Sequence, residues 1–300
     1  MKLSGLHLLV TYQCNLECDH CFVWGSPQQS GTMTLGFIRR ALQQARELGT
    51  VEWIYFEGGE PFLYYAIMVE GVRMATRLGF QVGIVSNGYW ATAVDDAVEW
   101  LRPFAGLIQD LSISSDLYHW SEQEREQAKH ARAAAEQLGI PIGIISIAGP
   151  EATNAASAVG QLPPGESAVM YRGRAAAKLV ARAARQPWAQ FTECPHEDLR
   201  EPGRVHLDPL GNVHICQGIS VGNILQTPLK EICETYNPDL HPITGPLLRG
   251  GPAELARHYG LPHAEGYADP CHLCDEARRA LRERFSDILR PDQMYGTSRS

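Results

Sequence analysis

The sequence predicts an α/β protein built on a parallel sheet, and three observations support this fold class. Short β-rich runs alternate roughly five or six times with longer runs of helical periodicity before residue 187, which is typical of βαβ units. That count is below the eight units of a complete barrel. Near residue 187 the alternation stops and prolines become frequent. We therefore expect a partial parallel (βα)6 barrel, open on one side, followed by a small α+β domain.

The strands and helices expected in the barrel follow from the period of the apolar residues. The expected strands cover 6–10, 51–56, 81–85, 107–114, 140–147 and a short run at 169–170. The expected helices cover 35–48, 63–78, 92–103, 121–138 and 175–184. Thr34 can cap the first helix and Gly49 can end it. The segment 149–166 is rich in Ala, Pro and Gly, so we expect a loop there.

The second domain is expected to begin with a β-hairpin. Residues 204–216 alternate around a Pro-Leu-Gly-Asn turn, which is a hairpin pattern. A short helix is expected at 229–236, where Cys233 falls on the apolar face and is expected to be buried. The rest is expected to be mostly loop over 237–270 around a helix near 253–259, then a last helix from Cys271. The predicted division is 1–186, 187–290 and a tail, 291–300, that is mobile unless it folds over the active site.

Composition narrows the classes of function. The chain has 300 residues, 44% hydrophobic and 20% charged, as in an ordinary globular protein. The formal net charge of −8 argues against a nucleic-acid partner, which needs a basic face. No run reaches the ~18 apolar residues that span a bilayer, and the start does not read as a signal peptide. We expect a cytoplasmic protein without a membrane partner. The chain has eight cysteines, and in a reducing cytoplasm thiols serve as metal ligands.

Three of these cysteines form the first candidate site. Cys14, Cys18 and Cys21 follow the first expected strand at the spacing C-x3-C-x2-C. A loop of this length lets three sulfurs converge, and three thiolates on a [4Fe-4S] cluster leave one iron free for a non-protein ligand. Zinc is the alternative, although zinc sites favour C-x2-C pairs with a fourth ligand nearby. His20 is the close candidate for that fourth ligand.

At these residues the chain resembles the radical S-adenosylmethionine (radical SAM) enzymes. Their motif has the same spacing with an aromatic residue after the third cysteine, here Phe22. One βαβ unit later, Gly58, Gly59, Glu60 and Pro61 follow a strand and are similar to the family's SAM-anchoring motif. Alone, this second motif also fits an ordinary strand-to-helix turn, but the pair is specific. The resemblance implies a partial barrel, a SAM-binding [4Fe-4S] cluster and S-adenosylmethionine as cofactor.

The resemblance also implies contacts to SAM from later strand ends. The polar residues concerned are Ser86, Asn87, Ser112, Ser114, Asp116 and Arg174. Period-two alternation turns Ser112 and Ser114 to one face, and a polar face suits a ribose, although these could also be satisfied core hydroxyls. Many relatives carry an aspartate where Ser114 falls, so Asp116 is an alternative. Arg174 could pair with the SAM carboxylate or be a helix-start arginine that serves solubility.

A second set of cysteines lies in the C-terminal part. Its members are Cys194, Cys216, Cys271 and Cys274. Together with Gly211 in the hairpin they resemble the twitch version of the SPASM domain, which holds a second, auxiliary [4Fe-4S] cluster. Four thiolates also suit a structural zinc ion. The interval from Cys194 to Gly211 is longer than usual, so His196 or a substrate atom is the alternative to Cys194.

The resemblance implies reductive cleavage of SAM to a 5′-deoxyadenosyl radical that abstracts a hydrogen atom from a substrate. We expect oxidation or cross-linking of a peptide or protein residue, with a small metabolite as the alternative. The absence of a leader-peptide-recognition domain before Leu6 is expected to weaken the peptide interpretation. The expected partner is a reductant such as flavodoxin or ferredoxin. A non-catalytic iron–sulfur or zinc protein is the other interpretation, and it predicts no affinity for SAM.

Overall fold

An eight-stranded sheet organises the computed structural model, which describes residues 1–119, 126–159, 162 and 164–297. Its strand order is β5-β4-β3-β2-β1-β7-β8-β9. The strands are β1 (Leu3–Thr11), β2 (Trp53–Gly58), β3 (Gln81–Ser86), β4 (Asp110–Ser114), β5 (Ile142–Ile145), β7 (Gly203–Leu207), β8 (Asn212–Cys216) and β9 (Ile219–Asn223). Strands β1 to β5 are parallel to one another. The predicted α/β class with a mostly parallel sheet is confirmed.

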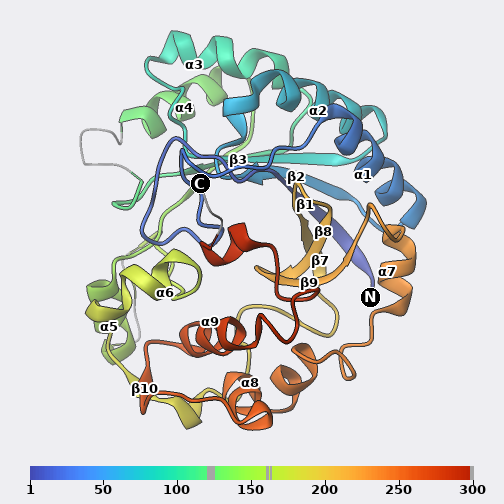
Figure 1. The fold of residues 1–300 in the computed structure, drawn as a ribbon. Helices are drawn as coiled ribbons and strands as arrows, with labels where there is room; N and C mark the ends of the chain where they lie inside the picture. The colour runs from blue at the N-terminus through green and yellow to red at the C-terminus, as the bar shows by residue number, and fades with distance from the viewer. Residues whose placement is uncertain (120–125, 160–161, 163, 298–300) are drawn as a thin grey trace.

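Four helices cover the outer face of the parallel strands, as Figure 1 shows. They are α1 (Leu35–Leu48), α2 (Tyr65–Arg77), α3 (Val94–Leu101) and α4 (Glu126–Gln137). Thr34 caps α1 by accepting a hydrogen bond from the backbone N–H of Phe37 at 3.1 Å, and Gly49 ends it with φ of 76°. These predictions are confirmed. Residues 121–125 of the helix expected at 121–138 lie outside the described residues.

The inner face of the sheet carries a polar and aromatic row. His7, Tyr55, Gly83 and Asp110 lie in register across β1, β2, β3 and β4. A Cβ atom at Gly83 would lie 2.2 Å from the Tyr55 ring, so glycine makes room for that ring. Because strand side chains alternate between faces, the apolar neighbours of these residues point to the helices instead. The barrel interior is therefore polar enough to bind a ligand.

Two parts of the predicted barrel are wrong. The segment expected to be a loop at 149–166 contains helix α5 (Pro150–Val159). Proline is favourable in the first turn of a helix and alanine is the best helix former, so the composition fits a helix as well. Residues 169–170 do not form a strand. The sixth parallel strand is β7, which pairs with β1 at the other side of the sheet.

The C-terminal part adds antiparallel strands and three helices. The expected hairpin is confirmed as the antiparallel pair β7 and β8, and β9 extends it. The helices are α7 (Leu229–Thr235), which buries Cys233 as expected, α8 (Thr244–Tyr259) and α9 (Pro270–Leu281). The short elements are α6 (Arg174–Lys178) and the pair of β6 (Gln186–Pro187) with β10 (Gly266–Tyr267). Within 237–270 the expected helix near 253–259 is confirmed as the second half of α8. Its first half, 244–249, was expected to be loop, and Gly250 and Gly251 separate the two halves with non-helical backbone angles.

The C-terminal segment is packed as far as residue 297. A 3₁₀ helix, Asp292–Tyr295, buries Met294 and Tyr295. The Tyr295 hydroxyl donates to the carbonyl of Gly218 at 2.8 Å, and Arg279 donates to the carbonyl of Tyr295 at 2.7 Å. The predicted tail thus packs against the rest of the chain over 291–295, and its mobility stays a prediction. Among the described residues, no helix combines the length and the apolar character that crossing a membrane requires.

Candidate active site

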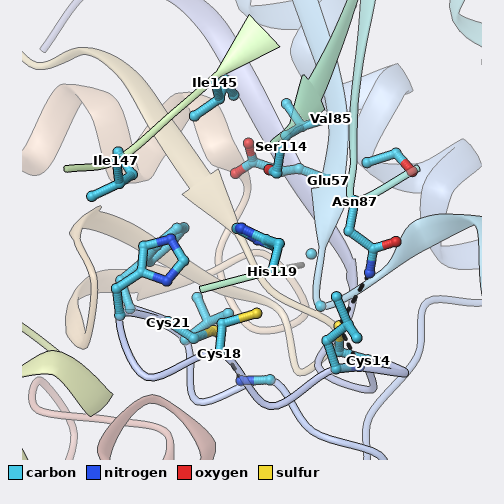
Figure 2. Close-up of a pocket in the computed structure, with 18 of the residues that line it drawn as sticks. Cys14, Cys18, Cys21, Glu57, Val85, Asn87, Ser114, His119, Ile145 and Ile147 are labelled. Atoms are coloured by element: carbon cyan, nitrogen blue, oxygen red, sulfur yellow. Dashed lines mark hydrogen bonds between the residues drawn. The ribbon is translucent and has the colours of Figure 1, made fainter. Parts of the chain in front are cut away.

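A cavity of ≈ 240 Å³ opens at the carboxyl ends of the parallel strands, where ligands bind in α/β sheets of this kind. Figure 2 shows that the side chains around it come from the loop after β1 and from the ends of the following strands. The predicted site residues on its wall are Cys14, Cys18, Cys21, Phe22, Gly58, Gly59, Ser86, Asn87 and Ser114. The structure thus brings together residues that are up to 100 positions apart.

All three thiols of the loop line the cavity, and two of them accept hydrogen bonds from backbone N–H groups. Cys14 and Cys18 are buried, and the backbone N–H of Leu16 donates to Cys14 Sγ at 3.4 Å. The backbone N–H of Gly25 donates to Cys21 Sγ at 3.2 Å. Burial raises the pKa of Cys14 to about 12 and raises that of Cys18 further. Burial therefore disfavours the free thiolates, and a bound metal ion would favour them.

The spacing of the thiols bears on the kind of metal. Within the described residues, neither the three cysteines of the loop nor the four C-terminal cysteines form a set whose sulfurs all lie within 4.8 Å of one another. Thiolates around one zinc ion would lie ~4 Å apart, because zinc–sulfur bonds measure about 2.3 Å. One ligand atom each from Cys18, His20 and His119 lies within 4.8 Å of the other two.

The Gly-Gly turn after β2 packs directly on the backbone of the cysteine loop. The N–H of Gly59 donates to the carbonyl of Thr11 at 2.7 Å, and the N–H of Glu60 donates to that of Gln13 at 2.9 Å. A Cβ atom at Gly59 would lie 2.2 Å from the Gln13 carbonyl oxygen. Only glycine permits this approach, so the turn and the loop form one unit.

Glu60 and Pro61 support the cavity from behind and do not line it. The buried Glu60 carboxylate accepts hydrogen bonds from the Ser86 hydroxyl at 3.0 Å and from the backbone N–H of Asn87 at 2.7 Å. Pro61 begins a 3₁₀ helix, Pro61–Tyr64, whose Phe62 N–H also donates to Glu60. Burial raises the pKa of Glu60 to about 7 against these donors. Glu60 therefore joins the ends of β2 and β3.

The serines and the aspartate near β4 divide between the cavity and its support. Ser114 lines the cavity, whereas the Ser112 hydroxyl donates to Asp110 at 3.0 Å, away from that wall. Asp116 is buried and lies 2.7 Å from Nδ1 of His119. Burial alone would raise the pKa of Asp116, but the hydrogen bond from His119 and its charge hold it below its usual value. Asp116 therefore orients His119, which lines the cavity.

The structure places Arg174 differently from the sequence expectation. Its guanidinium is buried and donates to the carbonyls of Cys18 and Gly25, both at 2.7 Å. It is absent from the described cavity wall, where Arg172 stands instead. In this structure Arg174 holds the cysteine loop closed, and its pairing with a SAM carboxylate stays a prediction.

We expect Arg174→Lys to lower the free energy of unfolding by about 2–3 kcal/mol, because lysine cannot donate to both carbonyls. Thermal unfolding and the iron content after reconstitution measure the effect, and iron content should fall with stability. Arg182→Lys is the control, since its pair with Glu151 is exposed and should cost under about 1 kcal/mol. Loss of SAM affinity with unchanged stability and iron would support the pairing with SAM instead.

The four C-terminal cysteines surround a second, smaller cavity. Cys194, Cys216, Cys271 and Cys274 all line it, and so does His196, which was the alternative to Cys194. Burial raises the pKa of Cys274 to about 12 and raises that of Cys271 well above its usual value. Arg172 lines both cavities, and its Nη1 lies 3.9 Å from Cys216 Sγ. This guanidinium therefore separates the two cysteine sets.

A buried carboxylate ties the strand before the first cysteines to the hairpin before Cys216. Asp208, at the end of β7, accepts hydrogen bonds from the Tyr12 hydroxyl at 2.9 Å and the Asn212 amide at 2.9 Å. His214 Nε2 lies 3.0 Å from the same carboxylate. The positions of both cysteine sets depend on this network.

Sequence reasoning missed Glu57, His119 and Arg172, all of which line the main cavity. Glu57 directly precedes the Gly-Gly turn, so a polar residue at a strand end was the available signal. Arg172 lies two positions before the arginine that was chosen. For His119 the signal was weak, because it follows Asp116 in a loop without a motif.

The fold and the cavity define an α/β protein whose parallel sheet presents three thiols at its carboxyl edge. Residues 8–152 match the sequence model of the radical SAM superfamily. This part of the chain is therefore a radical SAM domain. Among curated proteins, YydG of Bacillus subtilis (strain 168), which is named as a peptide biosynthesis protein, is 32% identical over 108 residues, 36% of this chain and 34% of that protein.

A second relative is the tungsten-containing aldehyde ferredoxin oxidoreductase cofactor-modifying protein of Pyrococcus furiosus. It is 35% identical over 110 residues, 36% of this chain and 29% of that protein. The chain spans about a third of the length of these curated relatives. The sequence likeness to both is thus confined to part of each protein.

Solved structures show a similar fold over most of the chain. Native anSMEcpe with bound AdoMet and Cp18Cys peptide has a TM-score of 0.53 at 14% identity and covers 95% of this chain and 98% of its own. BtrN in complex with AdoMet and 2-DOIA has a TM-score of 0.50 at 18% identity. The match covers 77% of this chain and 82% of the BtrN chain. At these identities the likeness shows the fold alone.

Proposed function

We propose that this chain is a radical SAM enzyme that abstracts a hydrogen atom from its substrate and thereby oxidises or cross-links a peptide or protein residue. The observation that carries the proposal is that the three thiols, the Gly-Gly turn and the polar strand ends line one cavity. When bound, an iron–sulfur cluster and SAM supply one-electron cleavage to a 5′-deoxyadenosyl radical. Cys14, Cys18 and Cys21 would hold that cluster.

Each remaining part of the wall has a role in this proposal. Gly58 and Gly59 would meet SAM with their backbone, and Phe22, Ser86, Asn87 and Ser114 would contact the rest of the molecule. Asn87 also reaches Cys14 Sγ at 3.7 Å, so it would orient that ligand. Ile145 and Ile147 also line the cavity and would give part of its wall an apolar surface, which helps to shield a reactive intermediate from water.

The second cysteine set would hold an auxiliary [4Fe-4S] cluster in a twitch-type or SPASM-type domain at about 187–290. Four thiols on the wall of one small cavity support a cluster, because four thiolates are a complete ligand set for it. It would accept an electron from the substrate radical. A reductant such as flavodoxin or ferredoxin would supply electrons to the first cluster.

A peptide or protein substrate is favoured by the relative that is named for peptide biosynthesis and by the peptide bound in the structure of similar fold. A small metabolite is the second candidate. It is favoured by the structure of BtrN, in which the small molecule 2-DOIA is bound together with AdoMet. The chemistry at the thiols is the same in both cases.

The first test measures SAM cleavage. Anaerobically reconstituted wild-type protein with SAM and dithionite should form 5′-deoxyadenosine, and Cys18→Ala should form at least ~100-fold less because a cluster ligand is lost. Cys233→Ala is the matched control, since this thiol is buried in α7, and it should keep the wild-type rate. No 5′-deoxyadenosine from the wild type would favour a non-catalytic metal protein.

The second test measures metal content. Cys271→Ala should lower the iron content from roughly eight to about four ions per chain if both sites hold [4Fe-4S] clusters. If the second site holds zinc, iron stays at about four in both proteins and the variant loses about one zinc ion. Plasma emission spectrometry on the two proteins decides between these outcomes.

A further inference from the structure

Three side chains on the inner face of the sheet meet beside the main cavity. His7 lies on β1, Glu57 on β2 and His206 on β7, and His7 is in register with His206. Nδ1 of His7 lies 3.2 Å from Oε2 of Glu57, and Nε2 of His206 lies 3.1 Å from Oε1. One ligand atom from each residue falls within a common distance of 4.8 Å. Three neighbouring strands thus converge on one point.

The three residues form a largely buried group, and its carboxylate has no arginine or lysine partner in the described part of the chain. Glu57 and His206 are 9% and 7% exposed. Burial alone would raise the pKa of Glu57, but His206 and His7 hold it well below its usual range, whereas burial lowers the pKa of His206. In the described part of the chain, the ion pairs of Glu57 are with these two histidines and not with an arginine or lysine. A buried carboxylate flanked by two imidazole rings has the donor set of a cation site.

Hydrogen bonds within the group leave one oxygen of Glu57 without a partner among the described residues. His7 and Glu57 have hydrogen-bond geometry. Oε1 of Glu57, in contrast, is buried without a hydrogen-bond partner among the described residues, although Nε2 of His206 is 3.1 Å away. The ring nitrogen and the carboxylate oxygen therefore lie 3.1 Å apart without the full geometry of a hydrogen bond. Two ligands of one ion have this relation.

The distances also fit an ion. Ligands bound at about 2.1 Å in tetrahedral or octahedral geometry lie ~3.0–3.4 Å apart, and both nitrogen–oxygen distances fall in that range. Two histidines and one carboxylate form a known facial ligand set for divalent first-row metals. We propose that His7, Glu57 and His206 bind a divalent first-row transition metal ion, separate from both cysteine sets.

The open side of this ion would face the cavity. Glu57 lines the same cavity as the three cysteines, and Figure 2 shows both on its wall. An ion here would present free coordination positions to a substrate oxygen, such as a carbonyl, carboxylate or hydroxyl group. This substrate role rests on the proposed function, whereas metal binding at the three residues does not. Failure of one would therefore leave the other standing.

The test uses holoenzyme with both cysteine sites reconstituted and loosely bound ions removed by chelator. Mn²⁺ is the probe because it prefers nitrogen and oxygen ligands to thiolates. Titration calorimetry and Mn²⁺ electron paramagnetic resonance should show about one bound ion per wild-type chain. Binding should weaken at least tenfold in His7→Ala, in His206→Ala and in the isosteric Glu57→Gln. His258→Ala, an exposed histidine, should bind as the wild type does.

Two outcomes overturn the proposal. No Mn²⁺ bound by the wild type would leave the group as a hydrogen-bonded support for Glu57. Equal binding by the wild type and all three site variants would place the ion elsewhere. Circular dichroism and iron content check that each variant is folded, and Glu57→Gln keeps the side-chain shape if either alanine variant fails to fold. Absence of 5′-deoxyadenosine with Mn²⁺ binding intact would reject the proposed function alone.

Discussion

Gly59→Ala is expected to lower the free energy of unfolding by about 3 kcal/mol or more and to weaken SAM binding at least tenfold. The added Cβ atom would lie 2.2 Å from the Gln13 carbonyl oxygen and 2.8 Å from that of Tyr12. These are backbone atoms, so the turn and the cysteine loop would have to separate. Urea unfolding and equilibrium dialysis with SAM measure the two effects.

Gly36→Ala is the matched control for this change. Gly36 lies exposed in helix α1, where an added Cβ atom would meet only the Thr34 hydroxyl at 3.8 Å. Alanine should raise stability there by about 0.5–1 kcal/mol, because glycine weakens a helix. If both variants unfold like the wild type, the close contact between turn and loop is not present in solution.

Asp208→Asn is expected to cost about 3–5 kcal/mol of stability, because a buried carboxylate with several donors would be replaced by an amide. Asp208 is fully buried and accepts from Tyr12, Asn212 and two backbone N–H groups, all at 2.9 Å. The amide group of asparagine would turn a donor toward these donors. Urea unfolding of both proteins at pH 7 measures the loss.

The same change should alter the acid dependence of stability. Burial alone would raise the pKa of Asp208, but hydrogen bonds from His214 and Asn212 lower it. A lowered pKa stabilises the fold above the unfolded value of ~3.9 and loses that contribution as pH falls through the folded value. Below pH ~4, the wild type should therefore lose stability more steeply than the variant.

Asp239→Asn is the control for Asp208→Asn. Asp239 accepts from both terminal nitrogens of Arg200 at 2.8 Å, but both side chains are exposed. Its loss should cost under about 1 kcal/mol. A similar small loss in Asp208→Asn would show that the network does not hold the hairpin against β1.

The helices and strands that carry a clear apolar period or a capping residue could be predicted from the sequence. The strand at 51–56 and the helix at 35–48 carry clear apolar periods and caps, and the structure has β2 and α1 there. The partner of β1 on its other side could not be predicted, because β7 is ~200 residues away and pairing of distant strands leaves no local signal. The first half of α8, before the break at Gly250 and Gly251, was missed because these glycines resemble a loop.

The site was predicted where residues are joined in short motifs. The cysteine loop and Gly58 with Gly59 reach the same cavity. The arginine on the cavity wall could not be predicted, because Gly173, with φ of 60°, separates two arginines, and the sequence does not say which one the turn directs to the cavity. His7 and His206 were missed because each looks like an isolated histidine in an apolar strand, and only the register of β1 with β7 joins them.

The pairing of β7 with β1 has a consequence for how this protein can be divided. A fragment that stops at residue 186 would retain the radical SAM match but would leave the long strand Leu3–Thr11 with a bare edge. Such an edge recruits other chains, and the Tyr12 hydroxyl would lose its carboxylate acceptor. Such a fragment should aggregate, so expression of the N-terminal half alone is a poor route to a working SAM site.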